Sequence, residues 1–161
     1  MDIQLNWKLI RKHFRRSFRS NFHVSIASVD EHNMPTVTPI GSLFLNKDQT
    51  GFYFEKFPAL LPLHTKANKN ICILAVNSKS RFWLKALLLG KFYSYPGIKL
   101  YGTLGERRKA TEKEKARLDR RMQFTKGLTG NTYLWRTMEY VREVQFNRVE
   151  KVHLGKMTGE L

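Results

Sequence analysis

A short segment around Pro62 combines a helix start with several cations, a pattern that suits a phosphate group. Proline is favoured in the first turn of a helix, where its missing N–H would have no partner. The free backbone N–H groups of that turn and the helix dipole both attract an anion. The candidate ligands are Lys56, His64, Thr65, Lys66 and Lys69. We expect a phosphate to be held chiefly by Lys66, Thr65 and the helix amides, with Lys56 as a second cation.

Other residue patterns that carry chemistry are missing from the sequence. The five histidines are scattered, without the paired spacing of a zinc site. The chain has no Gly-x-Ser-x-Gly elbow, no P-loop and no Gly-x-Gly-x-x-Gly. No pair of carboxylates stands out as an acid/base dyad. The sequence therefore predicts no metal site, and a bound cofactor would have to supply any redox chemistry.

Residues 23–76 read as strands and turns that must position the basic segment. Alternation of apolar and polar residues predicts the strands, and clusters of Asp, Asn and Gly predict the turns. The expected strands cover residues 23–29, 34–45, 52–54 and 71–76, with a short basic helix before the last. A meander in which one helix crosses to a buried strand predicts a barrel-like β architecture.

The composition is strongly basic, with 29 Lys and Arg against 13 Asp and Glu and a net charge of +16. Such a charge attracts phosphates, nucleic acid or anionic lipid. Residues 5–21 predict an amphipathic helix whose apolar stripe contains Trp7, Ile10, Phe14 and Phe18. Its basic face suits a membrane surface or nucleic acid, and its stripe suits packing on the barrel. We favour the packing.

A second basic segment covers residues 107–126. Thr111 and Glu114 have the spacing of a capping box, which predicts that a helix begins here. Lysines and arginines alternate with acidic residues along this helix, which is typical of a solvated face. No nucleic-acid-reading motif accompanies the charge, so we expect nucleic-acid binding to be weak and non-specific.

An apolar stretch covers residues 78–98. Residues 80–90 predict a short helix that ends at Gly90. The stretch is too rich in aromatic side chains for a free loop. We expect it to pack on the barrel or on a partner subunit, and the alternative is a lid over a flat aromatic ligand.

Length and composition fit one globular domain over residues 1–161. Hydrophobic residues make up 42% of the chain and aromatic residues 12%, which is typical of a folded protein. The single cysteine, Cys72, excludes an intrachain disulfide. There is no apolar run of about 18 residues and no leading apolar signal segment. We therefore expect a cytoplasmic protein without a transmembrane segment.

Several segments, in the order in which they occur, resemble the FMN-binding split β-barrel proteins of the pyridoxamine 5'-phosphate oxidase-like superfamily. The similar segments are Ala27–Asp30, Met34–Gly41, Thr65–Ile71, Lys99–Leu104, Thr111–Glu114 and Val141–Val152. The resemblance implies a mainly β (β+α) fold, a split β-barrel of antiparallel strands with flanking helices. It also makes residues 78–98 an insertion, because the simplest split barrels join the neighbouring strands with a tight turn.

The same resemblance implies a homodimer that binds FMN and acts as an oxidoreductase on an unidentified small molecule. The segment whose backbone flanks the flavin ring would be Thr38, Pro39, Ile40 and Gly41. Gly41 would permit close approach, and the alternative is that Pro39 and Gly41 mark a β-bulge. The residues expected near the partner's cofactor are Trp135, Tyr140 and Arg142.

The chain departs from the family before the short helix. Many members carry a Ser-Arg-Lys-like phosphate clamp there, whereas this chain reads Ala-Leu-Leu-Pro-Leu-His over residues 59–64. Two hypotheses therefore remain. The first is an FMN-dependent oxidoreductase. The second is a non-enzymatic basic module for nucleic acid or an acidic partner, or a split barrel that binds another cofactor such as haem.

Overall fold

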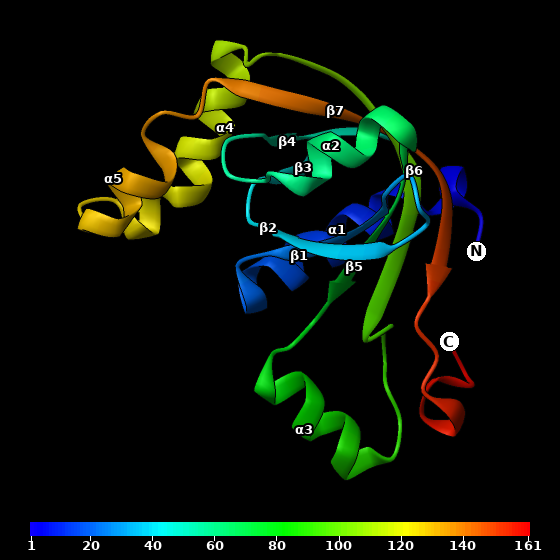
Figure 1. Ribbon diagram of the computed structural model, residues 1–161. Coiled ribbons are helices and arrows are strands. Elements are labelled where there is room, and N and C mark those ends of the chain that lie inside the picture. Colours follow the sequence, from blue (N-terminus) through cyan, green and yellow to red (C-terminus); the bar gives the residue numbers. More distant parts are fainter.

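The computed structural model describes all of residues 1–161, and its centre is one curled antiparallel sheet (Figure 1). The strands are β1 (Val24–Val29), β2 (Pro35–Ile40), β3 (Leu43–Leu45), β4 (Thr50–Phe54), β5 (Asn70–Val76), β6 (Gly97–Lys109) and β7 (Tyr140–Lys151). Their order across the sheet is β2-β1-β5-β6-β7-β4-β3. All seven strands therefore belong to a single hydrogen-bonded sheet.

The sheet must curl because its two edge strands are consecutive in the chain. β2 and β3 lie at opposite edges, yet only Gly41 and Ser42 join them. The Ser42 hydroxyl fixes this corner: it accepts from the Phe54 N–H at 3.1 Å and donates to the Phe54 carbonyl at 3.2 Å. The result is the split β-barrel of antiparallel strands that the sequence predicts, with flanking helices.

The structure corrects the prediction of one continuous strand over residues 34–45. That strand ends at Ile40 and resumes at Leu43, on the other side of the barrel opening. The pairing of β1 with β2 is regular from Val24 opposite Ile40 to Val29 opposite Pro35, so Pro39 does not mark a bulge. Proline is tolerated here because β2 is an edge strand with few N–H groups to lose.

The inner face of the curled sheet is covered by α1 (Ile3–Asn21). Strands β1 and β5 alternate between buried and half-buried residues, as the sequence pattern indicates. Against their buried side chains α1 places Trp7, Ile10 and Phe14, each at most 6% exposed. Burying a large apolar side chain contributes about 1.5–3 kcal/mol, so this stripe anchors the helix. The favoured packing of this helix on the barrel is confirmed.

Four further helices flank the sheet, and none of the helices is long and apolar enough to span a membrane. They are α2 (Leu60–Ala67), α3 (Ser80–Leu89), α4 (Glu112–Met122) and α5 (Thr129–Trp135), with 3₁₀ turns at Gln123–Thr125 and Gly155–Thr158. The predicted capping box begins α4: the Thr111 hydroxyl accepts from the Glu114 N–H, and the Glu114 carboxylate accepts from the Thr111 N–H. Leu118 of α4 packs in a second apolar cluster with Phe44 and Phe52.

The apolar insertion forms α3, which projects from the sheet on a side away from α4 and α5 (Figure 1). Gly90 ends the helix at a φ of +64°, as the sequence predicts. Phe82, Trp83 and Phe92 pack on one another, with ring centroids 5.2–6.4 Å apart. The aromatic residues thus stabilise the insertion itself, while its leucine face remains exposed, with Leu88 77% accessible.

Candidate functional site

The corner at the end of β2 lies against α5 at Gly41. A Cβ atom at this position would lie 3.1 Å from the Trp135 ring and 3.2 Å from the Phe22 carbonyl oxygen. Such distances are shorter than ordinary contacts, so a side chain at this position would push against the Trp135 ring and the Phe22 carbonyl. The sequence analysis expected Trp135 near the partner's cofactor, whereas the structure places it against Gly41 of its own chain.

An apolar cavity of about 390 Å³ lies beside this contact. Trp135 forms one wall, and the other apolar lining residues are Phe18, Phe22, Met122, Leu128 and Leu134. The volume and the lining are typical of pockets for small organic ligands. Phe22 and Leu134 are 69% and 47% exposed, so the cavity opens at the protein surface.

Lys56 lies on the loop between β4 and α2 and contacts α5, the helix that contains Trp135. Its Nζ donates to the carbonyl oxygen of Tyr133 in α5 at 3.1 Å. Four residues later α2 begins, and its N-cap residue Ala59 makes no side-chain hydrogen bond to the first turn. The N–H groups of that turn are therefore open to an anion, and Lys56 is the cation that precedes them in the chain.

The structure places Lys66 at the other end of α2. The helix begins at Leu60, two residues before Pro62, and Lys66 falls in its last turn. Six residues of helix separate the two ends by about 9 Å. Lys66 is exposed, but it lies at the opposite end of α2 from the N-terminal amides. The sequence analysis predicted that Lys66 and these amides would bind the phosphate together.

Two other predicted phosphate ligands on α2 are buried, and their side chains form hydrogen bonds to other residues of the protein. His64 Nδ1 lies 3.0 Å from the Ser28 hydroxyl of β1, and the Thr65 hydroxyl donates to the Leu61 carbonyl at 2.8 Å. On the neighbouring strand, Thr38 lies opposite Ile26, Pro39 is exposed and Ile40 is buried. The His64 side chain thus fixes α2 against β1, and the Thr65 hydroxyl is used by a hydrogen bond within α2 itself.

Arg142 belongs to a buried ion-pair cluster, here called the Glu55 cluster. Its guanidinium donates to both carboxylate oxygens of Glu55 and, at 3.1 Å, to the Gly105 carbonyl. The Tyr53 hydroxyl donates to the same carboxylate at 3.0 Å, and Arg107 lies 3.3 Å away. Hydrogen bonding to Glu55 raises the pKa of Arg142, and burial together with the Glu55 charge raises the pKa of Tyr53 well above its usual value.

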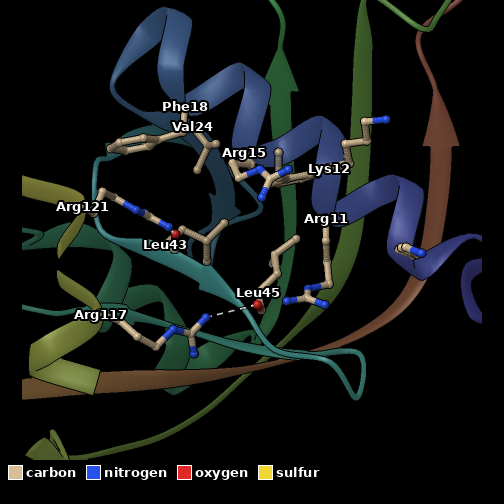
Figure 2. A pocket seen from close by; sticks show the side chains of 11 residues that line it. Arg11, Lys12, Arg15, Phe18, Val24, Leu43, Leu45, Arg117 and Arg121 are labelled. Carbon is tan, nitrogen blue, oxygen red and sulfur yellow. Dashed lines mark hydrogen bonds between the residues drawn. The ribbon is translucent and has the colours of Figure 1, made fainter. Parts of the chain in front are cut away.

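A second cavity, of about 360 Å³, lies between α1, β3 and α4 and is basic (Figure 2). Its lining cations are Lys8, Arg11, Lys12, Arg15, Arg117 and Arg121, and no acidic side chain lines it. Arg121 donates to the Leu43 carbonyl at 2.6 Å, and Arg117 donates to the Asn46 side chain at 2.7 Å. Both guanidinium groups also lie over the Phe44 ring. The sequence predicted two basic helices but not that they face each other.

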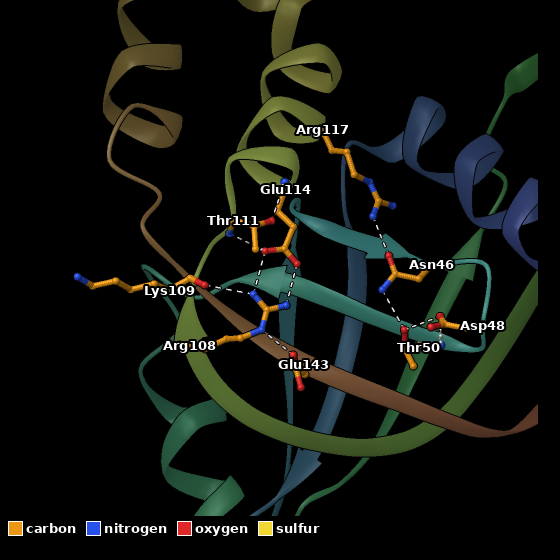
Figure 3. Close-up of polar contacts among 9 residues, drawn as sticks. All are labelled: Asn46, Asp48, Thr50, Arg108, Lys109, Thr111, Glu114, Arg117 and Glu143. Carbon is orange, nitrogen blue, oxygen red and sulfur yellow. Dashed lines mark hydrogen bonds and ion pairs between the residues drawn. The ribbon is translucent and has the colours of Figure 1, made fainter.

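Arg108, nearby on β6, shows the opposite arrangement (Figure 3). It makes a bidentate pair with Glu114 at 2.8 and 2.9 Å, and its Nε donates to Glu143 at 2.6 Å. The hydrogen bonds from Arg108 lower the pKa of Glu114. No group of three His, Cys, Asp or Glu side chains converges to hold a metal ion.

The fold is shared with several solved structures. An FMN-binding protein from Syntrophomonas wolfei is similar with a TM-score of 0.64 and 14% identity, covering 93% of this chain and 90% of the other. The haem storage protein HutZ from Vibrio cholerae is similar with a TM-score of 0.57 and 13% identity, over 94% and 95%. A candidate pyridoxamine 5'-phosphate oxidase from Lactobacillus delbrueckii has a TM-score of 0.52 and 16% identity, over 86% and 90%.

These similarities establish the fold. No family model matches the sequence, and no curated protein matches it. The chain shares the split β-barrel fold of these solved structures, as the order of its sequence segments predicted. Among the solved structures with this fold, the names include both a flavin-binding and a haem-storing protein.

Proposed function

We propose that residues 1–161 form one FMN-binding domain, and that two copies assemble into a homodimer that acts as an FMN-dependent oxidoreductase on a small molecule. The observation that supports this most is the shared fold with an FMN-binding protein over at least 90% of both chains. The aromatic cavity next to Gly41 adds support, because it is apolar and of a size that suits part of a flat ring system.

In this proposal, different residues of the chain bind the two ends of FMN. The backbone over Thr38–Gly41 and the Trp135 ring would border the isoalloxazine ring, which needs apolar walls and close backbone approach. Lys56 and the free N–H groups of α2 would hold the phosphate, with Lys66 as a more distant cation. His64, Thr65 and Arg142 would position these elements through their internal bonds.

A bound flavin supplies the electron-transfer chemistry, so the polypeptide must bind it, orient it and exclude water. A second copy of the chain would complete that enclosure. An exposed apolar patch lies around the cavity, formed by Phe22, Phe124, Leu128, Tyr133 and Leu134. Exposed patches of this kind normally mark an interface, and a twofold dimer would cover it on both subunits. We place this dimer in the cytoplasm as part of the proposal.

Titration of the purified protein with FMN, FAD and riboflavin tests the cofactor. We expect flavin fluorescence and calorimetry to show that FMN binds more tightly than the other two, because only FMN has a terminal phosphate and no adenosine to accommodate. Equal affinity for riboflavin would exclude a phosphate site. Failure of all three to bind would reject the proposal.

Haem is the competing ligand, since HutZ shares the fold. No histidine lines the cavity beside Trp135, and His13 and His64 are each only 7% exposed, which leaves them poorly placed as iron ligands there. We therefore expect haem to bind more weakly than FMN, with no Soret band in the purified protein. A stoichiometric haem spectrum would favour the alternative.

The hypothesis that the protein is a basic module for nucleic acid is tested by the salt dependence of binding. Non-specific contacts to several phosphates weaken steeply with salt, so we expect oligonucleotide binding to be largely lost between about 50 and 200 mM salt. Tight binding at the higher concentration would favour the nucleic-acid hypothesis over the flavin one.

A further inference from the structure

The basic cavity between α1, β3 and α4 concentrates positive charge without a counter-charge. Six cations line it and no carboxylate does, although the protein has 13 acidic residues to distribute. The four cations from α1 make no hydrogen bond or ion pair to another side chain. Like charges held this close repel one another unless an anion lies between them.

The two arginines from α4 are half-buried. Burial and the neighbouring Arg117 lower the pKa of Arg121 to about 9, which leaves it charged at neutral pH. Burial and Arg11, on the facing helix, lower the pKa of Arg117. An anion in the cavity would oppose both pKa shifts, because a nearby negative charge favours the charged form of an arginine.

Arg117 and Arg121 of α4 each use some of their N–H donors to bind the main chain of β3. β3 is an edge strand, and Arg117 and Arg121 donate to its carbonyl oxygens at Leu45 and Leu43. A guanidinium has five N–H donors, however, and Arg121 uses one of them and Arg117 two. The remaining donors lie at the cavity that Arg11 and Arg15 face from α1 (Figure 2). Such planar donor groups suit phosphate oxygens.

The cavity also has an apolar side. Phe14, Phe18, Val24, Leu43 and Leu45 contribute to its lining. A volume of about 360 Å³ lies at the lower end of the range for small-ligand pockets. Inorganic phosphate would use the cations but not the apolar wall, and a long nucleic acid would need an extended groove.

This cavity is separate from the proposed flavin phosphate position. Val24, at the start of β1, lines the cavity, whereas Ser28, four residues along the same strand, contacts α2 through His64. Four strand residues span about 13 Å. The two anion positions therefore lie at different ends of β1.

We propose that the cavity between α1, β3 and α4 binds an organic polyphosphate of about nucleotide size, with Arg11, Arg15, Arg117 and Arg121 on the phosphates and the apolar wall on its organic part.

Calorimetric titration with ATP, AMP and inorganic triphosphate tests this, each at about 50 mM salt and with FMN saturating. We expect one ATP per chain, bound at least about tenfold more tightly than AMP, which has fewer phosphate charges. Inorganic triphosphate should bind more weakly than ATP, because it has no organic part. Equal binding of triphosphate and ATP, or no binding of ATP, would overturn the proposal.

Two matched pairs of arginine substitutions in α1 test whether the cavity itself binds ATP. Arg11→Gln/Arg15→Gln removes two cavity cations that form no internal bond, and Arg16→Gln/Arg19→Gln removes the same charge from the same helix outside the cavity. The first pair should weaken ATP binding at least tenfold and the second less than threefold. Lys8→Gln/Lys12→Gln, also in the cavity, should weaken it even if the first variant folds poorly. Equal effects of cavity and control pairs would indicate a diffuse basic surface and reject the site.

Two further outcomes separate this site from its alternatives. ATP affinity should be the same with and without FMN, so a failure of the flavin proposal leaves this test intact. Displacement of ATP by FMN would mean that the cavity is the flavin's own phosphate site. Competition by a single-stranded oligonucleotide that persists at 200 mM salt would assign the cavity to nucleic acid instead.

Discussion

The arginines of this protein fall into two groups that differ in their partners. In the Glu55 cluster and around Arg108, each guanidinium binds a carboxylate within hydrogen-bond distance. Around the basic cavity, Arg117 and Arg121 bind only carbonyl, amide and aromatic groups. The residue type is the same in the two groups, so the difference lies in the partners that the fold supplies. The difference separates arginines that are paired with carboxylates and stabilise the fold from arginines at the cavity that have no acidic partner.

The sharpest way to break this comparison is to replace one buried arginine from each group by methionine. Arg142→Met leaves the carboxylate of Glu55, only 5% exposed, without its main partner, and should lower the free energy of unfolding by about 3 kcal/mol. Arg121→Met leaves no carboxylate behind and removes a desolvated charge, which offsets the loss of its hydrogen bond to the Leu43 carbonyl, so stability should stay within about 1 kcal/mol of the wild type. Urea unfolding monitored by tryptophan fluorescence measures both, and equal losses would contradict the comparison.

Lys56, on the loop before α2, and Lys66, in the last turn of α2, extend the comparison to the proposed flavin site. A charge-assisted hydrogen bond contributes about 1.5–3 kcal/mol, so Lys56→Ala should weaken FMN binding about tenfold to a hundredfold. Lys66→Ala should have a smaller effect, because Lys66 lies at the C-terminal end of the helix. Riboflavin affinity should change in neither variant. A larger effect of Lys66→Ala would restore the assignment made from the sequence.

Substitution of Glu114 has the smallest expected effect. The pH dependence of this effect tests the arginines that are paired with carboxylates. Arg108 and the Thr111 N–H lower its pKa, so this carboxylate stabilises the folded state above its ordinary pKa of about 4.5. That contribution is lost as the pH falls through the lowered value. Glu114→Gln should therefore reduce stability by about 1–2 kcal/mol at pH 7 and by progressively less below pH 4.5. A difference that is the same from pH 7 to pH 3 would show that the pair does not stabilise the protein.

The sequence predicted the elements that depend on local patterns. The aromatic stripe of α1, the capping box at Thr111 and the helix stop at Gly90 each follow from residues within a few positions of one another. Most of the strands were also predicted, although β6 continues to Lys109 rather than ending near residue 104. The order of these elements was enough to identify the barrel.

The features that the sequence did not reveal depend on distant contacts. The strand break at Gly41 follows from closure of the barrel, and Glu55 and Arg142 are 87 residues apart in the chain. The helix α5 has no clear apolar stripe, so no pattern indicated it. The basic cavity forms only when α1 and α4 are brought together by the sheet. Such sites require the fold before they can be found.

Native mass spectrometry of the purified protein after incubation with FMN tests the central proposal most directly. One chain has a mass of 19.0 kDa. We expect a species of two chains with two FMN molecules, because each subunit supplies one aromatic cavity and one α2 N-terminus. A species of one chain without flavin, or of two chains that carry haem instead, would contradict the account.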